Sequence, residues 1–125
     1  MKKLFTIFAM ATAIFSANSA SAAEVEENNF NNYHATKTER VSANSSDEYE
    51  VFFNADESVL VIVVGDGDTD LDLYIYDEND NLIDKDVDTT DTCVCSWTPK
   101  WSGSFTIKVK NLGSVYNEYT ISVTQ

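Results

Sequence analysis

The sequence predicts an all-β domain, an antiparallel β-sandwich of about seven to eight short strands. From Asp47 onward apolar residues recur with a period of two, turn residues interrupt this alternation at short intervals, and no stretch has a helical period. A hydrophobic content of 43% with 12% aromatic residues is sufficient for a folded core. The length of 125 residues fits one domain.

The first 22 residues have the three parts of an export signal. Lys2 and Lys3 supply a positive start, an apolar run follows over 4–15, and the small residues 20–22 form a cleavage site of the A-x-A kind. The apolar run is too short to span a bilayer, which takes about 20 residues. We therefore expect cleavage after Ala22, export to the periplasm or the medium, and no membrane insertion.

The next segments differ in composition. Residues 23–36 are rich in Glu and Asn and have no sustained period, which predicts a flexible polar N-terminal extension. Residues 37–43 are expected to form a short edge strand at the start of a single domain that covers 37–125. Residues 58–64 form a continuous apolar run, typical of a central strand that is covered on both faces.

The other strands are predicted where apolar and polar residues alternate. Turns rich in Gly, Asn and Asp separate them. These strands lie at 49–53, 71–76, 105–110 and 119–124.

Four aspartates stand at alternate positions, Asp66, Asp68, Asp70 and Asp72. The last two share a face of the predicted strand, and the first two lie in the preceding glycine-containing loop. Calcium prefers several carboxylate and carbonyl oxygens, and like charges at this density repel each other unless something neutralises them. The pattern therefore predicts either a calcium site formed by these four residues or a solvated acidic face.

Cys93 and Cys95 form a C-x-C pair. In an exported chain two cysteines suggest a disulfide. However, residues i and i+2 of an extended strand are about 6.5 Å apart, whereas bridged Cβ atoms lie near 3.8 Å. The geometry favours free thiols packed on the face shared with Trp97, and a strained bridge at a bulge is the alternative.

Three aromatic residues are candidates for a ligand platform, namely Tyr74, Tyr76 and Trp101. Aromatic rings stack on sugars or on peptide prolines. The two tyrosines share a face with Asp70 and Asp72, which gives a mixed acidic and aromatic surface. Ordinary packing within a sandwich is the alternative for each ring.

Charge and composition exclude several functions. The chain has 8 basic and 21 acidic residues, a formal charge of −13, and about half of the acids lie between Asp66 and Asp91. Bulk charge of this sign does not bind nucleic acid and keeps a protein monomeric by self-repulsion. The one histidine, His34, lies in the predicted extension, so a Ser/His/Asp or Cys/His arrangement is not expected. We therefore expect no enzyme activity.

The stretch from Glu48 to Thr124 resembles the bacterial pre-peptidase C-terminal domain. The resemblance is carried by DLDLYIYD at 70–77, NLI at 81–83, WTP at 97–99, a Ser102-Gly103 turn, FTIKV at 105–109 and YTI at 119–121. It implies a sandwich of jelly-roll character that serves exported proteins as an accessory or binding module, often behind a protease domain. Relatives in the wider group bind calcium, and some bind insoluble substrates such as collagen.

These observations predict an exported, non-catalytic binding or accessory module that calcium stabilises. Its expected partner is an extracellular or periplasmic protein or polymer. The alternative is an inhibitor or chaperone companion of a separately encoded secreted protease, because an acidic body can mimic an anionic pro-segment. A purely structural surface protein is a third hypothesis, against which an exposed aromatic patch would argue.

Overall fold

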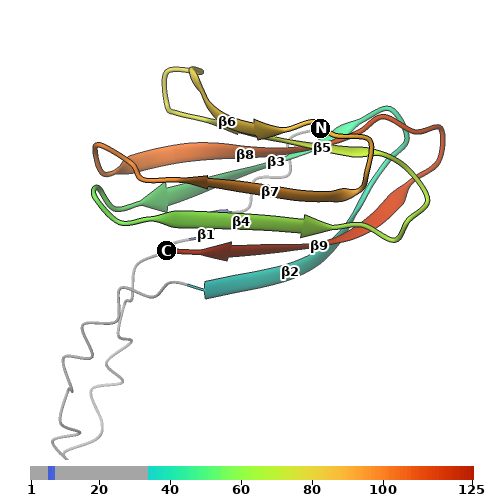
Figure 1. Cartoon of the computed structure of the whole chain (residues 1–125), viewed down its shortest axis with the longest axis horizontal. Helices are drawn as coiled ribbons and strands as arrows, with labels where there is room; N and C mark the ends of the chain where they lie inside the picture. The colour runs from blue at the N-terminus through green and yellow to red at the C-terminus, as the bar shows by residue number, and fades with distance from the viewer. Residues whose placement is uncertain (1–5, 8–33) are drawn as a thin grey trace, which may run out of the picture.

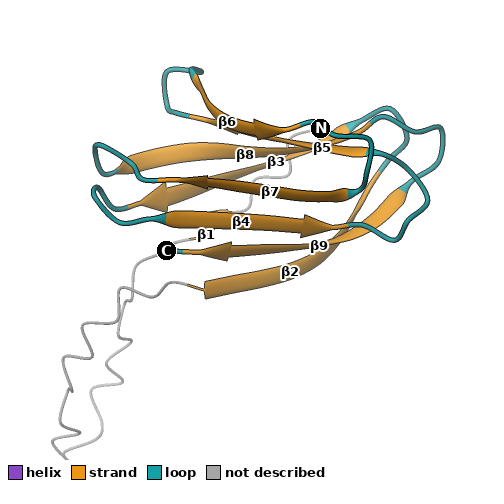
Figure 2. Ribbon diagram, viewed as in Figure 1, coloured by secondary structure: helices purple, strands orange, loops and turns teal. Residues whose placement is uncertain are grey.

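The computed structural model describes Thr6, Ile7 and residues 34–125, and it places these residues in two packed β-sheets (Figure 1). Figure 2 shows strands joined by loops only, and the described residues include no helix long and apolar enough to cross a membrane. The strands are β1 (Thr6–Ile7), β2 (His34–Val41), β3 (Ser46–Phe53), β4 (Val59–Val64), β5 (Leu71–Tyr76), β6 (Leu82–Asp86), β7 (Thr92–Trp97), β8 (Gly103–Asn111) and β9 (Asn117–Thr124).

Strand order identifies the architecture as a jelly roll. Sheet A has the order β1-β3-β8-β5-β6, and sheet B has the order β2-β9-β4-β7. All pairings among β2 to β9 are antiparallel, and the two-residue β1 adds to β3 in parallel. Eight strands that alternate between two sheets in this way form the double Greek key of a jelly roll. The predicted all-β, antiparallel, jelly-roll-like sandwich is confirmed.

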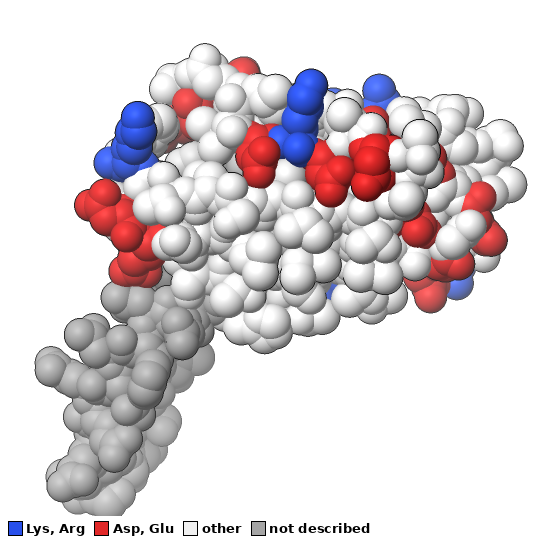
Figure 3. Space-filling view, viewed as in Figure 1, with Lys and Arg blue, Asp and Glu red and all other residues white. Residues whose placement is uncertain are grey.

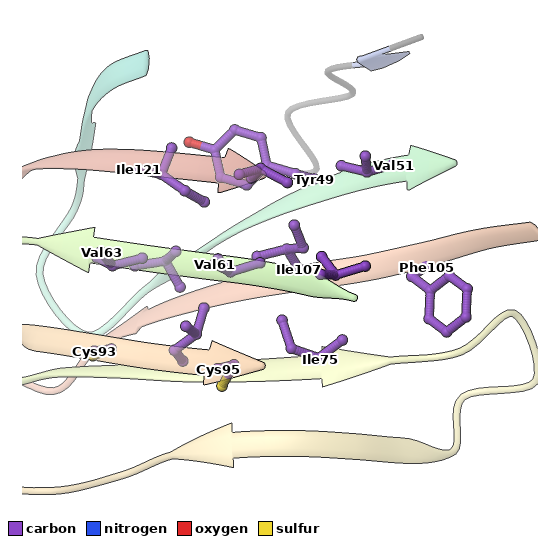
Figure 4. Close-up of a cluster of buried hydrophobic side chains, with 14 of the residues drawn as sticks. Tyr49, Val51, Val61, Val63, Ile75, Cys93, Cys95, Phe105, Ile107 and Ile121 are labelled. Carbon is purple, nitrogen blue, oxygen red and sulfur yellow. The ribbon is translucent and has the colours of Figure 1, made fainter. Parts of the chain in front are cut away.

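The core lies between the two sheets, as the period of two predicts. Alternate residues of each strand point inward, so β8 and β9 each show a regular alternation of buried and half-buried side chains. Figure 4 shows inward side chains of several strands packed together. Among the largest fully buried side chains are Tyr49, Tyr119, Phe53, Phe105, Leu71, Leu73, Ile75 and Ile107.

A short chain of hydroxyl hydrogen bonds crosses this core. The hydroxyl of Tyr119 donates to Asp47 at 2.8 Å, and the hydroxyls of Tyr49 and Tyr119 are hydrogen-bonded to each other. Burial raises the pKa of Tyr49 to about 12 and raises that of Tyr119 as well. Both phenols are therefore neutral near physiological pH, and their hydrogen bonds satisfy polar groups that would otherwise be costly to bury.

Two predictions about strands are wrong in detail. The first sandwich strand begins at His34 and not at 37, so the last three residues assigned to the extension belong to β2. The outward side of β4 is also not covered, because Leu60 and Val64 are exposed there. An apolar run shows that a strand is stable in a sheet, but it does not show what covers each face.

The predicted export signal and the rest of the polar extension lie outside the described residues, apart from Thr6 and Ile7. Those two residues pair with Glu50 and Val51 at the edge of β3. Among the described residues, the buried core cluster lies between Val41 and Val123.

Candidate functional site

The predicted metal ligands Asp66 and Asp68 lie in the loop between β4 and β5. The Asp66 carboxylate accepts hydrogen bonds from the backbone N–H of Glu118 at 2.9 Å and of Asp68 at 3.0 Å. These bonds favour the charged form and lower the pKa of Asp66. Asp68 is exposed in the same loop. Asp66 therefore connects the loop to the start of β9.

Asp91 is a third member of this loop region that sequence reasoning missed. Its carboxylate accepts the backbone N–H of Gly67 at 2.5 Å and the side-chain amide of Asn117 at 3.4 Å. A Cβ at Gly65 would lie 2.3 Å from this carboxylate, so the close approach requires glycine there. Asp91 lies within the acid-rich stretch, and that density was the one signal available in the sequence.

Asp70 and Asp72 form a different group. Asp72 lies on the outward side of β5 with 6% of its area exposed, and its Oδ2 accepts the hydroxyl of Tyr74 at 3.3 Å. The Oδ1 atoms of Asp70 and Asp72 are both buried without a hydrogen-bond partner among the described residues. Burial raises the pKa of Asp70, and so do the charges of Asp72, Asp88 and Asp91.

The structure therefore divides the four predicted ligands. The charges of Asp72, Asp88 and Asp91 all act on Asp70, whereas the Asp66 carboxylate accepts the Asp68 N–H within the loop. Within residues 34–125, no three acidic, histidine or cysteine side chains converge closely enough to hold a metal ion as they stand. The two orphaned carboxylate oxygens are nevertheless the kind of donor that calcium takes, and a cation there would offset their mutual repulsion.

The aromatic candidates also separate into two groups. The rings of Tyr74 and Tyr76 stack with centroids 6.2 Å apart and planes 16° apart, and both side chains are half-buried. Trp101 instead stacks on the buried Phe105 with centroids 6.1 Å apart. The tyrosine pair lies on the outer face of sheet A, where Tyr74 stands opposite Lys85 and Lys108. The surface there is mixed in charge and not mainly acidic.

Cys93 and Cys95 both point into the core from β7 and are unbridged. The thiol of Cys93 donates to the carbonyl of Leu71 at 3.1 Å. Burial, reinforced by nearby aspartates, raises the pKa of each thiol to about 12. Since the thiolate is the reactive form, these groups are poor nucleophiles in the folded protein.

Both thiols should therefore react slowly with a disulfide reagent in the native state. We expect little labelling of folded protein between pH 7 and 9, because this range lies far below a pKa of about 12. Two thiols should react promptly once urea unfolds the chain. Fast labelling of the native protein would contradict the buried placement, and no labelling in urea before reduction would show that the pair is bridged.

The outer face of sheet B is uncharged apart from the Arg40–Glu118 pair at one end, and we term its uncharged part the neutral face. Residues that pair directly across antiparallel strands point to the same side of a sheet, so the register identifies its members. They are His34, Thr36, Thr38, Leu60, Ile62, Val64, Thr92, Val94, Ser96, Thr120, Ser122 and Thr124. Figure 3 shows this region as a continuous white surface with acidic and basic side chains around it.

Hydrogen bonds between side chains connect β2 and β9 across the neutral face. Thr36 and Ser122 lie 3.2 Å apart, and Thr38 and Thr120 lie 3.1 Å apart. His34 Nδ1 bonds the Thr124 hydroxyl at 3.0 Å. Such cross-strand pairs restrain the rotamers of exposed side chains. The neutral face is thereby held in one shape on that side.

The apolar part of the neutral face lies on β4 and β7. Leu60, Val64 and Val94 expose 38%, 48% and 48% of their areas, and Ile62 stands directly opposite Val94. Sequence reasoning missed this surface because it predicted β4 to be covered on both faces. The signal that could have found it is the run of uncharged Thr and Ser at alternate positions in two strands of a very acidic chain.

Comparison with known proteins identifies the fold. No family model and no curated protein matches the sequence. The pre-peptidase C-terminal domain of a collagenase from Bacillus anthracis has a TM-score of 0.58 at 15% identity, covering 70% of this chain and 88% of that domain. PliG of Aeromonas hydrophila, a periplasmic inhibitor of g-type lysozyme, has a TM-score of 0.59 at 13% identity, covering 74% and 85%.

A third solved structure, the mitogen derived from Yersinia pseudotuberculosis, has a TM-score of 0.59 at 14% identity and covers 74% of this chain and 85% of its own. At these identities the likeness shows a common fold. It is the fold that the resemblance to pre-peptidase C-terminal domains implied, and that implication is confirmed.

Proposed function

We propose that this chain is an exported, non-catalytic binding module that recognises an extracellular or periplasmic protein through the neutral face. The observation that carries the proposal is an uncharged surface that extends over all four strands of sheet B in a chain with a net charge of −13. Interfaces that bind proteins have few charges at their centre and a polar rim. The neutral face has this arrangement, with Arg40 and Glu118 paired at one end at 2.8 Å.

Burial of exposed apolar area and the restrained side chains of β2 and β9 both favour binding at the neutral face. Covering Leu60, Val64 and Val94 removes exposed apolar area from water, which is worth roughly 25 cal/mol per Å² before the costs of association. The hydroxyl pairs between β2 and β9 are already ordered, so less side-chain entropy is lost on binding. The acidic surfaces elsewhere would repel anionic partners and favour a neutral or basic one.

Inhibition of a secreted hydrolase is the second candidate function. PliG, which shares the fold, is described as a periplasmic inhibitor of g-type lysozyme. The sequence separately suggested an inhibitor or chaperone companion of a separately encoded secreted protease. Both versions are specific forms of protein binding, and both predict that the purified chain slows the hydrolase it binds.

The test is an affinity capture from periplasm and culture medium with matched surface variants. A genuine partner should be retained by the wild type and lost with Val94→Lys, since a lysine there puts a charge in the apolar part of the neutral face. Phe52→Lys is the control, because Phe52 is similarly exposed at 41% but lies on sheet A. Loss with both variants, or with neither, would contradict the proposal.

The captured protein then identifies the function. A hydrolase that the chain inhibits in a turnover assay would support the second candidate. Sedimentation of the chain with chitin, cellulose or collagen, without a protein partner, would instead show that a polymer occupies the neutral face. Both variants should keep the wild-type melting temperature, so that lost binding reflects the surface and not unfolding.

We also propose that calcium stabilises the acidic end of sheet A. Support comes from the two buried, unpartnered oxygens of Asp70 and Asp72, with Asp88 and Asp91 near enough to raise the pKa of Asp70. These four carboxylates would hold the ion, and it would neutralise their repulsion. The proposal replaces Asp66 and Asp68 of the sequence-based set, because both are exposed in the loop and neither has the buried, unpartnered oxygen that Asp70 and Asp72 each have.

A further inference from the structure

The two open sides of the sandwich are built differently. On one side, β6 of sheet A lies beside β7 of sheet B, and two aspartates of β6 close the gap. Asp84 accepts the backbone N–H of Ser96 at 3.0 Å, and Asp86 accepts that of Val94 at 2.9 Å. Inward charges on an edge strand are a known protection against strand addition. The edge of β7 is therefore occupied by side chains of its own domain.

The other side, between β2 and β3, contains a cavity of about 290 Å³. Apolar side chains form most of its wall, among them Val51 from β3 and Ile107 and Ile121 from deeper strands, while Ala35 and Lys37 of β2 lie on the other wall. Figure 4 shows Val51, Ile107 and Ile121 pointing into the space between the sheets. A cavity of this size, at the lower limit of ligand pockets, suits one or two side chains.

An extended segment of this chain already lies on the edge of β3 beside the cavity. Thr6 pairs with Glu50 and Ile7 pairs with Val51, in parallel. Val51 thus belongs both to the pairing and to the cavity wall. The paired residues come from the apolar run at 4–15, which is part of the predicted export signal. The edge of β3 therefore pairs with two residues of an apolar sequence in strand conformation.

We propose that the edge of β3 and the adjoining cavity form an acceptor site for an extended apolar segment of a partner polypeptide. Main-chain hydrogen bonds to β3 would supply affinity, and an apolar side chain in the cavity would supply selectivity. In the full chain Thr6 and Ile7 already pair with this edge, so removal of residues 1–22 would free it. Thr36 of β2 lines the cavity and also belongs to the neutral face, but the acceptor site does not depend on binding at that face.

The test uses a fluorescein-labelled peptide of residues 2–8 (KKLFTIF) as the probe and residues 23–125 as the protein. That protein retains every described residue of the core cluster, and its melting curve must first show a cooperative transition. Fluorescence anisotropy should show saturable binding, and the full chain of 125 residues should bind at least tenfold more weakly because its edge is occupied. In NMR spectra the amides of Glu50 and Val51 should shift on binding.

Replacement of two different alanines by tryptophan provides a test variant and its matched control. Ala35→Trp fills the cavity and should weaken probe binding at least tenfold, whereas Ala55→Trp, a similarly half-buried site in the turn after β3, should leave binding unchanged. Melting curves must show that both variants fold. Val94→Lys on the neutral face should also leave binding unchanged, so the outcome is separable from that of the proposed function.

Four results would overturn the proposal. These are the absence of saturable binding to residues 23–125, equal binding by Ala35→Trp, and equal binding of a probe carrying Ile7→Pro, which would indicate apolar adsorption without a strand. The fourth is dimerisation of residues 23–125 through Glu50 and Val51, which would make a second copy the occupant.

A spin label at the C-terminus of the probe should broaden the amide of Phe53 more than that of Asp47 if the strand adds in parallel.

Discussion

Replacement of Phe53 by Ala should lower the free energy of unfolding by about 3–5 kcal/mol, whereas Phe52→Ala should change it by less than about 0.5 kcal/mol. Phe53 is fully buried, and its ring packs edge-on against Trp97 with centroids 5.3 Å apart and against Phe105 at 5.9 Å. Phe52 points outward from sheet A and is 41% exposed. A domain of this size has only about 5–15 kcal/mol of stability, so the first variant should be close to unfolding.

Urea denaturation followed by tryptophan fluorescence measures both effects, since Trp97 contacts Phe53 directly. The midpoint should fall strongly for Phe53→Ala with little change in the slope. A larger loss for Phe52→Ala than for Phe53→Ala would mean that the strand register is wrong, because a shift of one residue exchanges the inner and outer faces. Phe53→Leu should lose less than Phe53→Ala, because it leaves a smaller cavity.

Millimolar calcium should raise the melting temperature by roughly 10 °C or more relative to EDTA. A ligand present at 100 times its dissociation constant stabilises the fold by about 2.7 kcal/mol. In a domain of this size that energy corresponds to a shift of this magnitude. Magnesium and high salt are the controls, since salt alone screens exposed acids and produces a smaller, non-specific rise. An equal rise with salt would contradict a calcium site.

Asp72→Asn should abolish the calcium response and should raise the melting temperature in EDTA. The carboxylate of Asp72 is almost fully buried beside Asp70, so loss of its charge relieves a repulsion that calcium would otherwise offset. Asp68→Asn is the matched control, since Asp68 is exposed in the loop and its variant should keep the response. If Asp68→Asn abolishes the response and Asp72→Asn does not, the ion lies in the loop as the sequence first suggested.

Much of the fold could be predicted from local pattern because a sandwich strand has one face in the core. The alternation at 71–76, 105–110 and 119–124 identified the inward residues of β5, β8 and β9. The same reasoning failed at β2, where the half-buried inward residues include Lys37 and Glu39. β2 is an edge strand beside a cavity and has no alternation of apolar and polar residues. The sequence pattern therefore did not show that this strand begins at His34.

The candidate sites were less predictable, because they depend on residues that are distant along the chain. Asp66 and Asp72 belong to one short motif, yet one binds the backbone of Glu118 and the other lies buried on β5. Spacing in an extended strand predicts a common face, but a loop residue turns toward whichever donor the tertiary structure brings near. The tyrosine pair followed the strand rule, while Trp101 lies at the end of the core on Phe105.

The sequence by itself determined the all-β class, the inward face of most strands and the excess of acidic charge, because each follows from local periodicity or from counting. Only the tertiary structure decided which strands are neighbours, and the order of the strands determines which side chains share a surface. The neutral face exists because β2, β9, β4 and β7 meet in one sheet, although they are far apart in sequence. Likewise, Asp84 and Asp86 of β6 close one edge of the sandwich, while the edge of β3 pairs with the two residues of β1.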